Sequence, residues 1–425
     1  MRFRPAGLTK TQRRNFFYTQ MDAVGVAIVM AVNPFLAVFL TRLGATNQQV
    51  GLLSAIPGVA GIALGLFMGG FLQTRKNIVP WYSWARTIRL ISFAGVGIIS
   101  LLLPAHAAIP AILGLWKLSS IPQSLLNVAF SVLMNAMGGP RGRFRILSRR
   151  WSTIGVVGAL MTIVVGQVLD RIAFPLNYQL SFIVFAVTGA LVSYAFSSRF
   201  DVPDTEPSEA LDADDPLRER LRDLAAMVIS EKPFLRIVAK RLVYIMGSHL
   251  VMPLFALYYV RELNATDGQI SIITTVQKAT LLIGYYTWTR LRERKGARFV
   301  LLATTLVMSL YPAVTAATRD VWLMVVIAGL SSIFQAGINL VFFDELMKTV
   351  PEEHSALFVS VVQTLQNVQA IIGPIVSTWL AGFIGLGGAL LLGAAFRLAG
   401  FALFFLDRGS RDRVTSEVRP APTVE

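Results

Sequence analysis

The amino-acid sequence predicts an all-α integral membrane protein, with twelve transmembrane helices arranged as two pseudo-symmetric halves of six helices each. Three observations predict this fold class. Hydrophobic residues make up 54% of the 425 residues and charged residues only 15%, whereas a soluble domain carries roughly a quarter charged residues. Long apolar segments alternate with short basic loops. Finally, two sequence patterns from the first half of the chain return in the second half.

The internal repeat has two parts. In the first, residues 34–49 match residues 253–269 at an offset of 219–220 (Pro34, Ala37, Arg42, Leu43, Ala45, Thr46 and Gln49 against Pro253, Ala256, Arg261, Leu263, Ala265, Thr266 and Gln269). In the second, residues 119–130 match residues 331–342 at an offset of 212 (Ser119, Ser120, Gln123, Asn127 and Phe130 against Ser331, Ser332, Gln335, Asn339 and Phe342). A membrane protein built from two same-handed halves typically works by alternating access, with its substrate bound where the halves meet.

Hydropathy and turn signals divide the chain into the expected spans. A transmembrane helix needs about 20 mostly apolar residues, and breaks fall at motifs such as Gly44-Ala45-Thr46-Asn47 and Gly138-Gly139-Pro140. The twelve predicted spans are 16–42, 48–72, 80–103, 109–137, 147–173, 178–198, 234–260, 268–290, 298–317, 321–347, 356–384 and 387–406.

Basic residues predict the orientation of the spans. With the amino terminus in the cytoplasm, most Lys and Arg residues fall at inner ends, and the outer loops hold little beyond Arg42, Arg171, Arg261 and Arg319. This asymmetry follows the positive-inside rule and agrees with an even number of spans. We therefore expect a multi-pass protein of the cell (inner) membrane, embedded in the lipid bilayer, with both termini cytoplasmic.

Composition also excludes several kinds of partner and site. The formal net charge is +15, but the basic residues lie in short loops and not on one compact face, so we expect no nucleic-acid partner. Cysteine is absent, which excludes disulfides and thiolate metal sites. The three histidines are scattered without metal-ligand spacing, and no acidic metal motif accompanies them. We therefore expect no metal, no cofactor and no enzyme activity.

One long hydrophilic interruption, residues 199–233, separates the two halves. Leu217, Leu221, Leu224 and Val228 recur there at helical spacing, which favours an amphipathic helix in the plane of the cytoplasmic face. A solvated linker is the alternative. The predicted organisation is an amino-terminal half (1–198), the cytoplasmic linker (199–233), a carboxyl-terminal half (234–406) and a disordered cytoplasmic tail (407–425).

A motif at the cytoplasmic ends resembles that of the major facilitator superfamily, Gly-x-Leu-small-Asp-(Arg/Lys)-x-Gly-x-(Arg/Lys), which the family carries after its second helix and again after its eighth. Residues 290–298 resemble the second copy, with Glu293 in place of Asp, and residues 69–76 keep a glycine and the basic pair of the first copy, with Gln73 in place of Asp. The resemblance implies two six-helix halves and a cytoplasmic gate that involves Glu293, Arg294, Arg298 and Arg75. Ordinary positive-inside charges are the alternative for these four residues.

Polar side chains form matching stripes inside the predicted spans. The stripe of the fourth span has steps of three and four residues, which place its members on one helix face (Lys117, Ser120, Gln123, Asn127 and Ser131). Ser332, Gln335 and Asn339 repeat it in the tenth span, and Gln363 and Asn367 belong to a weaker stripe in the eleventh. The family resemblance implies that spans one, four, seven and ten line a central cavity. The alternative is that these amides hold neighbouring helices together.

Charged residues deep in the spans are costly unless they pair or face water. Lys278 lies about 15 Å into the eighth span at 1.5 Å per residue. Together with Lys117 it is expected to bind an anionic group of a substrate, or else one of the two lysines pairs with an acid such as Asp22. Asp22 in the first span is the candidate for proton coupling, with a structural salt bridge as the alternative. Arg86 and Arg89 are expected to extend toward the cytoplasmic edge.

These observations predict a secondary active transporter that moves a small polar solute, with an anionic one favoured, by alternating access coupled to a proton or another ion. The expected substrate-binding residues are Lys117, Gln123, Asn127, Lys278, Gln335, Asn339, Gln363 and Asn367. Export of amphipathic compounds or drugs is the alternative function. A membrane receptor or assembly protein that does not transport is a further one.

Overall fold

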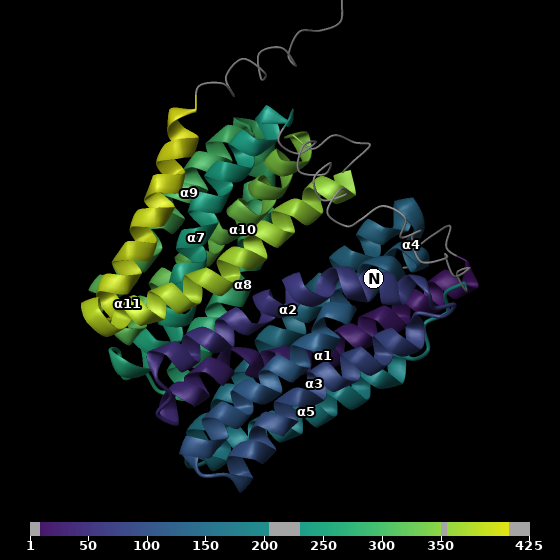
Figure 1. Ribbon diagram of the computed structural model, residues 1–425, viewed down its shortest axis with the longest axis horizontal. Helices are drawn as coiled ribbons and strands as arrows, with labels where there is room; N and C mark the ends of the chain where they lie inside the picture. The colour runs from purple at the N-terminus through teal and green to yellow at the C-terminus, as the bar shows by residue number, and fades with distance from the viewer. Residues whose placement is uncertain (1–8, 204–229, 350–354, 408–425) are drawn as a thin grey trace, which may run out of the picture.

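The computed structural model describes residues 9–203, 230–349 and 355–407, and these residues are almost entirely helical (Figure 1). Among them, eight helical stretches are long and apolar enough to cross a membrane. The predicted amphipathic helix of the linker lies outside the described residues, as does the predicted tail beyond Asp407. The all-helical membrane class predicted from composition therefore holds for the described part of the chain.

The amino-terminal group of helices consists of α1 (Lys10–Arg42), α2 (Asn47–Gln73), α3 (Val79–Leu102), α4 (Ala105–Arg171) and α5 (Leu176–Ser197). The starts of α1 and α2 are each fixed by a capping box, in which a Thr hydroxyl and a Gln side chain three residues later satisfy each other's backbone N–H groups. Thr46 and Gln49, which form the box of α2, belong to the first sequence repeat. The end of α1 and the start of α2 are therefore encoded locally.

Helix α4 turns back on itself. Its hydrogen-bonded course runs through both the predicted spans 109–137 and 147–173, so the predicted break at Gly138-Gly139-Pro140 does not interrupt the assigned helix. Yet the Arg150 guanidinium carbon lies 5.3 Å from the centroid of the Phe130 ring, whereas a straight helix would separate residues 130 and 150 by about 30 Å. The chain therefore reverses between these two residues, and α4 has two arms.

The carboxyl-terminal group consists of α7 (Lys232–Arg261), α8 (Asp267–Lys295), α9 (Ala297–Ala317), α10 (Val321–Thr349) and α11 (Ser355–Leu406). Thr266 and Gln269 form the capping box of α8, as Thr46 and Gln49 do for α2. Helix α11 changes direction at Gly385, whose φ of 75° and ψ of 168° are not helical. It therefore also has two arms, which correspond to the predicted spans 356–384 and 387–406.

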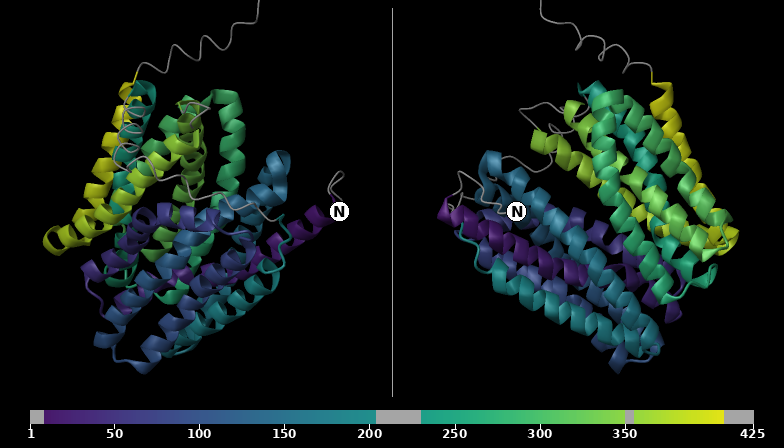
Figure 2. Two further views of the ribbon diagram at one scale, coloured as in Figure 1. Left: turned by 45° about the vertical axis from the view of Figure 1, so that its right-hand side comes forward. Right: turned by 180° about the vertical axis from the view of Figure 1, so that it is seen from behind.

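The two groups lie side by side and diverge toward one end of the molecule (Figures 1 and 2). We call the end where α1 and α7 finish the Arg42 end, and the end where α1 begins the Lys10 end. The largest apolar cluster contains residues of both groups, including Leu36, Val50, Leu254 and Ile270. Near the Lys10 end, two smaller clusters, one around Leu126 and one around Phe234 and Phe358, each contain residues of one group only.

Glycines permit the closest helix contacts within each group. A Cβ atom built on Gly25 of α1 would lie 2.5 Å from the backbone nitrogen of Ser193 and 2.6 Å from the carbonyl oxygen of Gly189, both in α5. These neighbours are backbone atoms, which cannot rotate away as a side chain can. The contact between α1 and α5 therefore requires glycine at this position.

Substitution Gly25→Ala is expected to lower the free energy of unfolding by about 1–3 kcal/mol, because the added methyl group forces α1 and α5 apart. Thermal denaturation of the purified protein in detergent measures the effect. Gly114→Ala is the matched control, since a Cβ there meets nothing within 4 Å. Equal melting temperatures for the two variants would contradict the assigned packing.

Candidate functional site

The polar stripes of α4 and α10 form the same local structure. The Gln123 side-chain amide donates to the Asn127 side-chain oxygen at 2.8 Å, and Gln335 donates to Asn339 at 2.9 Å. The serines of the repeat also correspond, because Ser119 and Ser331 each donate to the carbonyl oxygen three residues earlier. The second sequence repeat is therefore a structural repeat, with one glutamine–asparagine pair in each group of helices.

The asparagine of each pair is exposed, and the glutamines are partly buried. Asn339 also donates to the Tyr285 hydroxyl of α8 at 3.0 Å, and Gln123 accepts from Arg89 Nε of α3 at 3.2 Å. Tyr285 was not singled out from the sequence, because a single tyrosine within an apolar helix carries no distinctive signal. Each asparagine therefore has an exposed side chain, although Asn339 also bonds to a neighbouring helix.

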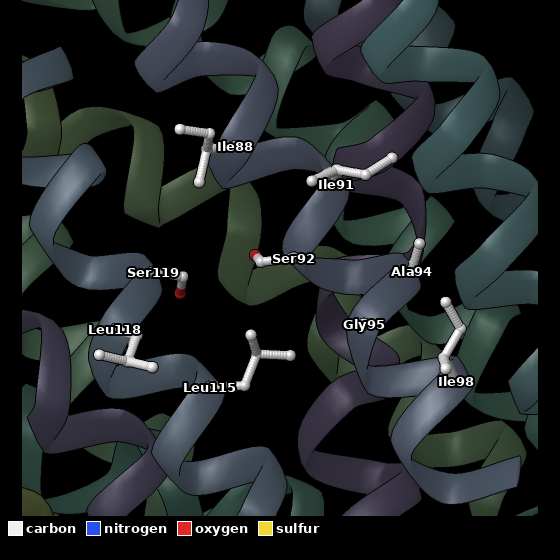
Figure 3. A pocket seen from close by; sticks show the side chains of 9 residues that line it. All are labelled: Ile88, Ile91, Ser92, Ala94, Gly95, Ile98, Leu115, Leu118 and Ser119. Carbon is white, nitrogen blue, oxygen red and sulfur yellow. The ribbon is translucent and has the colours of Figure 1, made fainter. Parts of the chain in front are cut away.

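The sequence predicted that Arg89 extends toward the cytoplasmic edge of the membrane, but its side chain does not do so. Its guanidinium carbon lies 4.0 Å from the centroid of the Trp116 ring, and its Nη1 contacts the hydroxyl groups of Ser92 and Ser119. These two serines also line an apolar groove of about 370 Å³ between α3 and α4 (Figure 3). Arg89 thus bonds both to the two serines that line this groove and to Gln123.

The two candidate lysines have different surroundings. Lys278 Nζ donates to the Thr162 hydroxyl of α4 at 2.8 Å, a contact between the two groups of helices. Lys117 is exposed on α4. The expected alternative that one of them pairs with Asp22 is not realised, because Asp22 pairs with Arg150. Lys278 is therefore positioned at the interface of the groups, with no carboxylate partner among the described residues.

Asp22 is fully buried in a hydrogen-bonded cluster of the amino-terminal group. Its Oδ2 lies 2.7 Å from Arg150 Nη1, and its Oδ1 accepts from the Ser193 hydroxyl. The Tyr82 hydroxyl lies 3.5 Å from Asp22 and accepts from Arg86 at 2.6 Å. This arrangement matches the salt-bridge alternative for Asp22, and it also explains why Arg86 does not extend to the membrane edge.

The two α11 candidates, Gln363 and Asn367, differ in how closely they contact a neighbouring helix. Asn367 packs against α2, where a Cβ on Gly61 would lie 2.8 Å from its side-chain nitrogen and a Cβ on Gly58 would lie 2.9 Å from its carbonyl oxygen. Gln363, one turn earlier, is exposed. Asn367 therefore contributes to the packing of α2 on α11, and Gln363 remains the freer of the two side chains.

The predicted cytoplasmic gate residues are not assembled into one contact. Arg75 lies over the rings of Phe71 and Trp81, at 4.5 and 5.0 Å from their centroids. Arg298 contacts the Phe405 carbonyl, and Glu293 and Arg294 are exposed. Two ion pairs of the carboxyl-terminal group lie in this region, Arg292–Asp344 at 2.6 Å and Lys240–Asp407. The family motif placed the expected gate at Glu293, Arg294 and Arg298, so Arg292 was not singled out from the sequence.

Hydrogen bonds between the two groups gather at the Arg42 end. Arg42 Nε lies 2.7 Å from Asp267 Oδ1, which also accepts from the Tyr178 hydroxyl at 2.6 Å. Asp170 accepts from the backbone N–H of Gly268 at 2.8 Å. Burial raises the pKa of Asp267 by more than the hydrogen bonds from Tyr178 and Arg42 lower it. The attraction to Arg42 therefore offsets only part of the desolvation of this carboxylate.

Substitution Asp22→Asn is expected to lower the free energy of unfolding by about 3–5 kcal/mol, since it leaves the buried Arg150 without its counter-charge. Thermal denaturation in lipid nanodiscs measures this effect. Arg14→Gln is the control, because it breaks an exposed pair with Asp201 that is expected to contribute less than about 1 kcal/mol. A stable Asp22→Asn variant that loses only proton-driven accumulation and keeps exchange would instead support the coupling role.

A family model and several solved structures are similar to this chain. Residues 237–424 match the family model described as Major Facilitator Superfamily. No curated protein matches the sequence. The model is similar to a bacterial homologue of the iron transporter ferroportin in an inward-facing state, with a TM-score of 0.72, 14% identity, and coverage of 94% of this chain and 98% of the other.

Two further solved structures have the same fold. A mutant of the nucleoside transporter NupG matches with a TM-score of 0.69 and 13% identity, over 92% of this chain and 99% of the other. A bacterial homologue of the human lysosomal transporter Spinster, inward-facing and unoccupied, matches with a TM-score of 0.67 and 14% identity, over 98% of this chain and 100% of the other. Residues 237–424 therefore resemble the Major Facilitator Superfamily by sequence, and the described chain shares the fold of these three transporter structures.

Proposed function

We propose that this protein is a secondary active transporter that moves a small polar solute by alternating access between two six-helix bundles. The amino-terminal bundle (1–198) would comprise α1, α2, α3, both arms of α4 and α5. The carboxyl-terminal bundle (234–406) would comprise α7 to α10 and both arms of α11. Residues 199–233 would link the bundles, and 407–425 would form a tail. Counting each arm as a span gives the twelve expected from the sequence.

The observation that carries this proposal is the repeated glutamine–asparagine pair. Asn127 and Asn339 are exposed near the middle of their helices, where contact with lipid would be costly. A water-filled space between the bundles removes that cost and gives a substrate two amides that both donate and accept hydrogen bonds. The pairs therefore support a polar solute over an apolar one.

Positive charge favours an anionic group on that solute. Lys278 lies at the interface of the bundles and bonds only to a neutral hydroxyl among the described residues. Lys117 is on the same helix as Gln123 and Asn127, and Arg89 bonds to Gln123. The carboxylate of Asp22 is already neutralised by Arg150. A carboxylate or phosphate on the substrate would supply the missing negative charge.

The distribution of basic residues supports a cytoplasmic Lys10 end and termini, in the cell (inner) membrane. The contacts at the Arg42 end and the divergence at the Lys10 end then describe an inward-facing protein, closed toward the outside. In the outward-facing state we propose that the Lys10 end closes and brings Arg75 toward Glu293, Arg294 and Arg298. Asp22 remains our candidate for coupling transport to protons.

Export of an amphipathic compound is the second candidate function. The apolar groove between α3 and α4 favours it, because Ile88, Ile91 and Leu118 form an apolar wall near the half-buried Arg89. None of the four amide side chains lines this groove, so we rank this function second. A receptor that does not transport would need no alternation of the two ends.

The absence of cysteine allows a direct test with single reporter thiols. Asn127→Cys and, separately, Asn339→Cys are expected to react with a membrane-impermeant maleimide applied from either side of sealed vesicles, because each position faces a cavity that opens alternately. Leu118→Cys is the control in the same helix, since its 65% exposed side chain lines the apolar groove and is expected to react slowly. Reaction of the asparagine positions from neither side would assign these amides to helix packing.

A further inference from the structure

The Arg42 end contains the same arrangement twice, in opposite directions. Arg42 Nη2 donates to the Ala265 carbonyl at 2.8 Å, and its Nε donates to Asp267 at 2.7 Å. Arg261 Nη2 donates to the Ala45 carbonyl at 2.6 Å, and its Nη1 donates to the Asn47 side-chain oxygen at 2.5 Å. Each arginine of the first sequence repeat thus binds the turn that follows the other arginine.

The backbone of the two turns explains why the arrangement repeats. Gly44 and Asn264, at corresponding positions, both have positive φ, of 91° and 48°. The capping boxes at Thr46 and Thr266 then start α2 and α8 in the same way. Each turn therefore presents one carbonyl oxygen and one side-chain oxygen toward the opposite group, at the spacing that a guanidinium group can bridge.

The two copies differ in charge and burial. The acceptor of Arg42 is the buried carboxylate of Asp267, which also accepts from the Tyr178 hydroxyl, whereas the acceptor of Arg261 is the neutral, half-buried amide of Asn47. An ionised acceptor gives a stronger hydrogen bond than a neutral one. Loss of Arg42 would leave the buried Asp267 carboxylate without its counter-charge in the closed state, so it is expected to open this end more than loss of Arg261.

We propose that these two reciprocal arginine contacts, which we call the paired clasps, form the outer gate of the transporter. Each group of helices supplies one arginine and one acceptor turn, so separating the groups breaks both clasps together. Two bidentate contacts that release together give a gate with a closed and an open state and few stable positions between them. The role as an outer gate rests on the alternating-access function proposed above, but the closure itself can be measured without transport.

The experiment measures the distance across the Arg42 end. Spin labels on Leu102→Cys and Trp322→Cys, whose side chains are 73% and 58% exposed, report the separation of the groups by pulsed electron paramagnetic resonance in nanodiscs. With Arg42→Ala and Arg261→Ala combined, we expect a longer-distance population and an open-to-closed ratio at least about tenfold higher, the factor that corresponds to about 1.4 kcal/mol. Each single variant should give a smaller change, with Arg42→Ala the larger.

Arg319→Ala is the matched control, because Arg319 pairs with Glu262 at 2.7 Å at the same end but within one group, and its distances should not change. A charge exchange tests the mechanism: Asp267→Asn should open the gate in part, and adding Asn47→Asp should close it again by strengthening the Arg261 clasp. Unchanged distances in the double arginine variant, or failure of Asn47→Asp to restore closure, would overturn the proposal. Normal thiol labelling from both sides would leave the transport function standing in that case.

Discussion

Within a bilayer, a polar group has to find its partners inside the protein, because lipid offers no hydrogen bonds. Much of this structure follows from that constraint. Asp22 is fully buried and receives hydrogen bonds from three helices, including one from an arginine. Arg89 and Arg397 are held by hydroxyl groups, aromatic faces and carbonyl oxygens. Serine and threonine side chains throughout donate to carbonyl oxygens one turn earlier in their own helices.

The same constraint distinguishes groups that support the fold from groups that are available to a substrate. A polar side chain whose hydrogen bonds lie within one group of helices, such as Asp22, can keep the same neighbours while the two groups move. A polar side chain that is exposed at mid-helix, or whose partner belongs to the other group, changes its surroundings when the groups move. Asn127 and Asn339 are exposed at mid-helix, and the partner of Lys278 belongs to the other group. This is why we place the substrate near them.

The sequence predicted the helical membrane class, most helix boundaries and the repeat, because hydropathy and capping motifs act locally. The repeat also identified Gln335 and Asn339 as the counterparts of Gln123 and Asn127, because both copies keep the same spacing of four residues. Partners that are distant in the chain could not be predicted. The pairing of Asp22 with Arg150, the contact of Asn367 with Gly61, and the role of Arg292 all depend on how helices pack. Arg42 and Arg261 were visible in the repeat, but their reciprocal bonds required the relative placement of the two groups.

Divergence between the repeats shows where the two groups differ in chemistry. The crossing of α1 and α5 at Gly25 and Gly189 has a counterpart where α7 and α11 cross at Gly247 and Gly393. Ser193, four residues after Gly189, corresponds to Arg397, and Asp22, three residues before Gly25, corresponds to Tyr244. The Arg397 guanidinium carbon lies 5.9 Å from the centroid of the Tyr244 ring. The same close crossing thus surrounds a carboxylate in one group and a cation over an aromatic ring in the other. If a proton drives the cycle through Asp22, protonation takes place in the amino-terminal group only, because Tyr244 occupies the corresponding position in the carboxyl-terminal group.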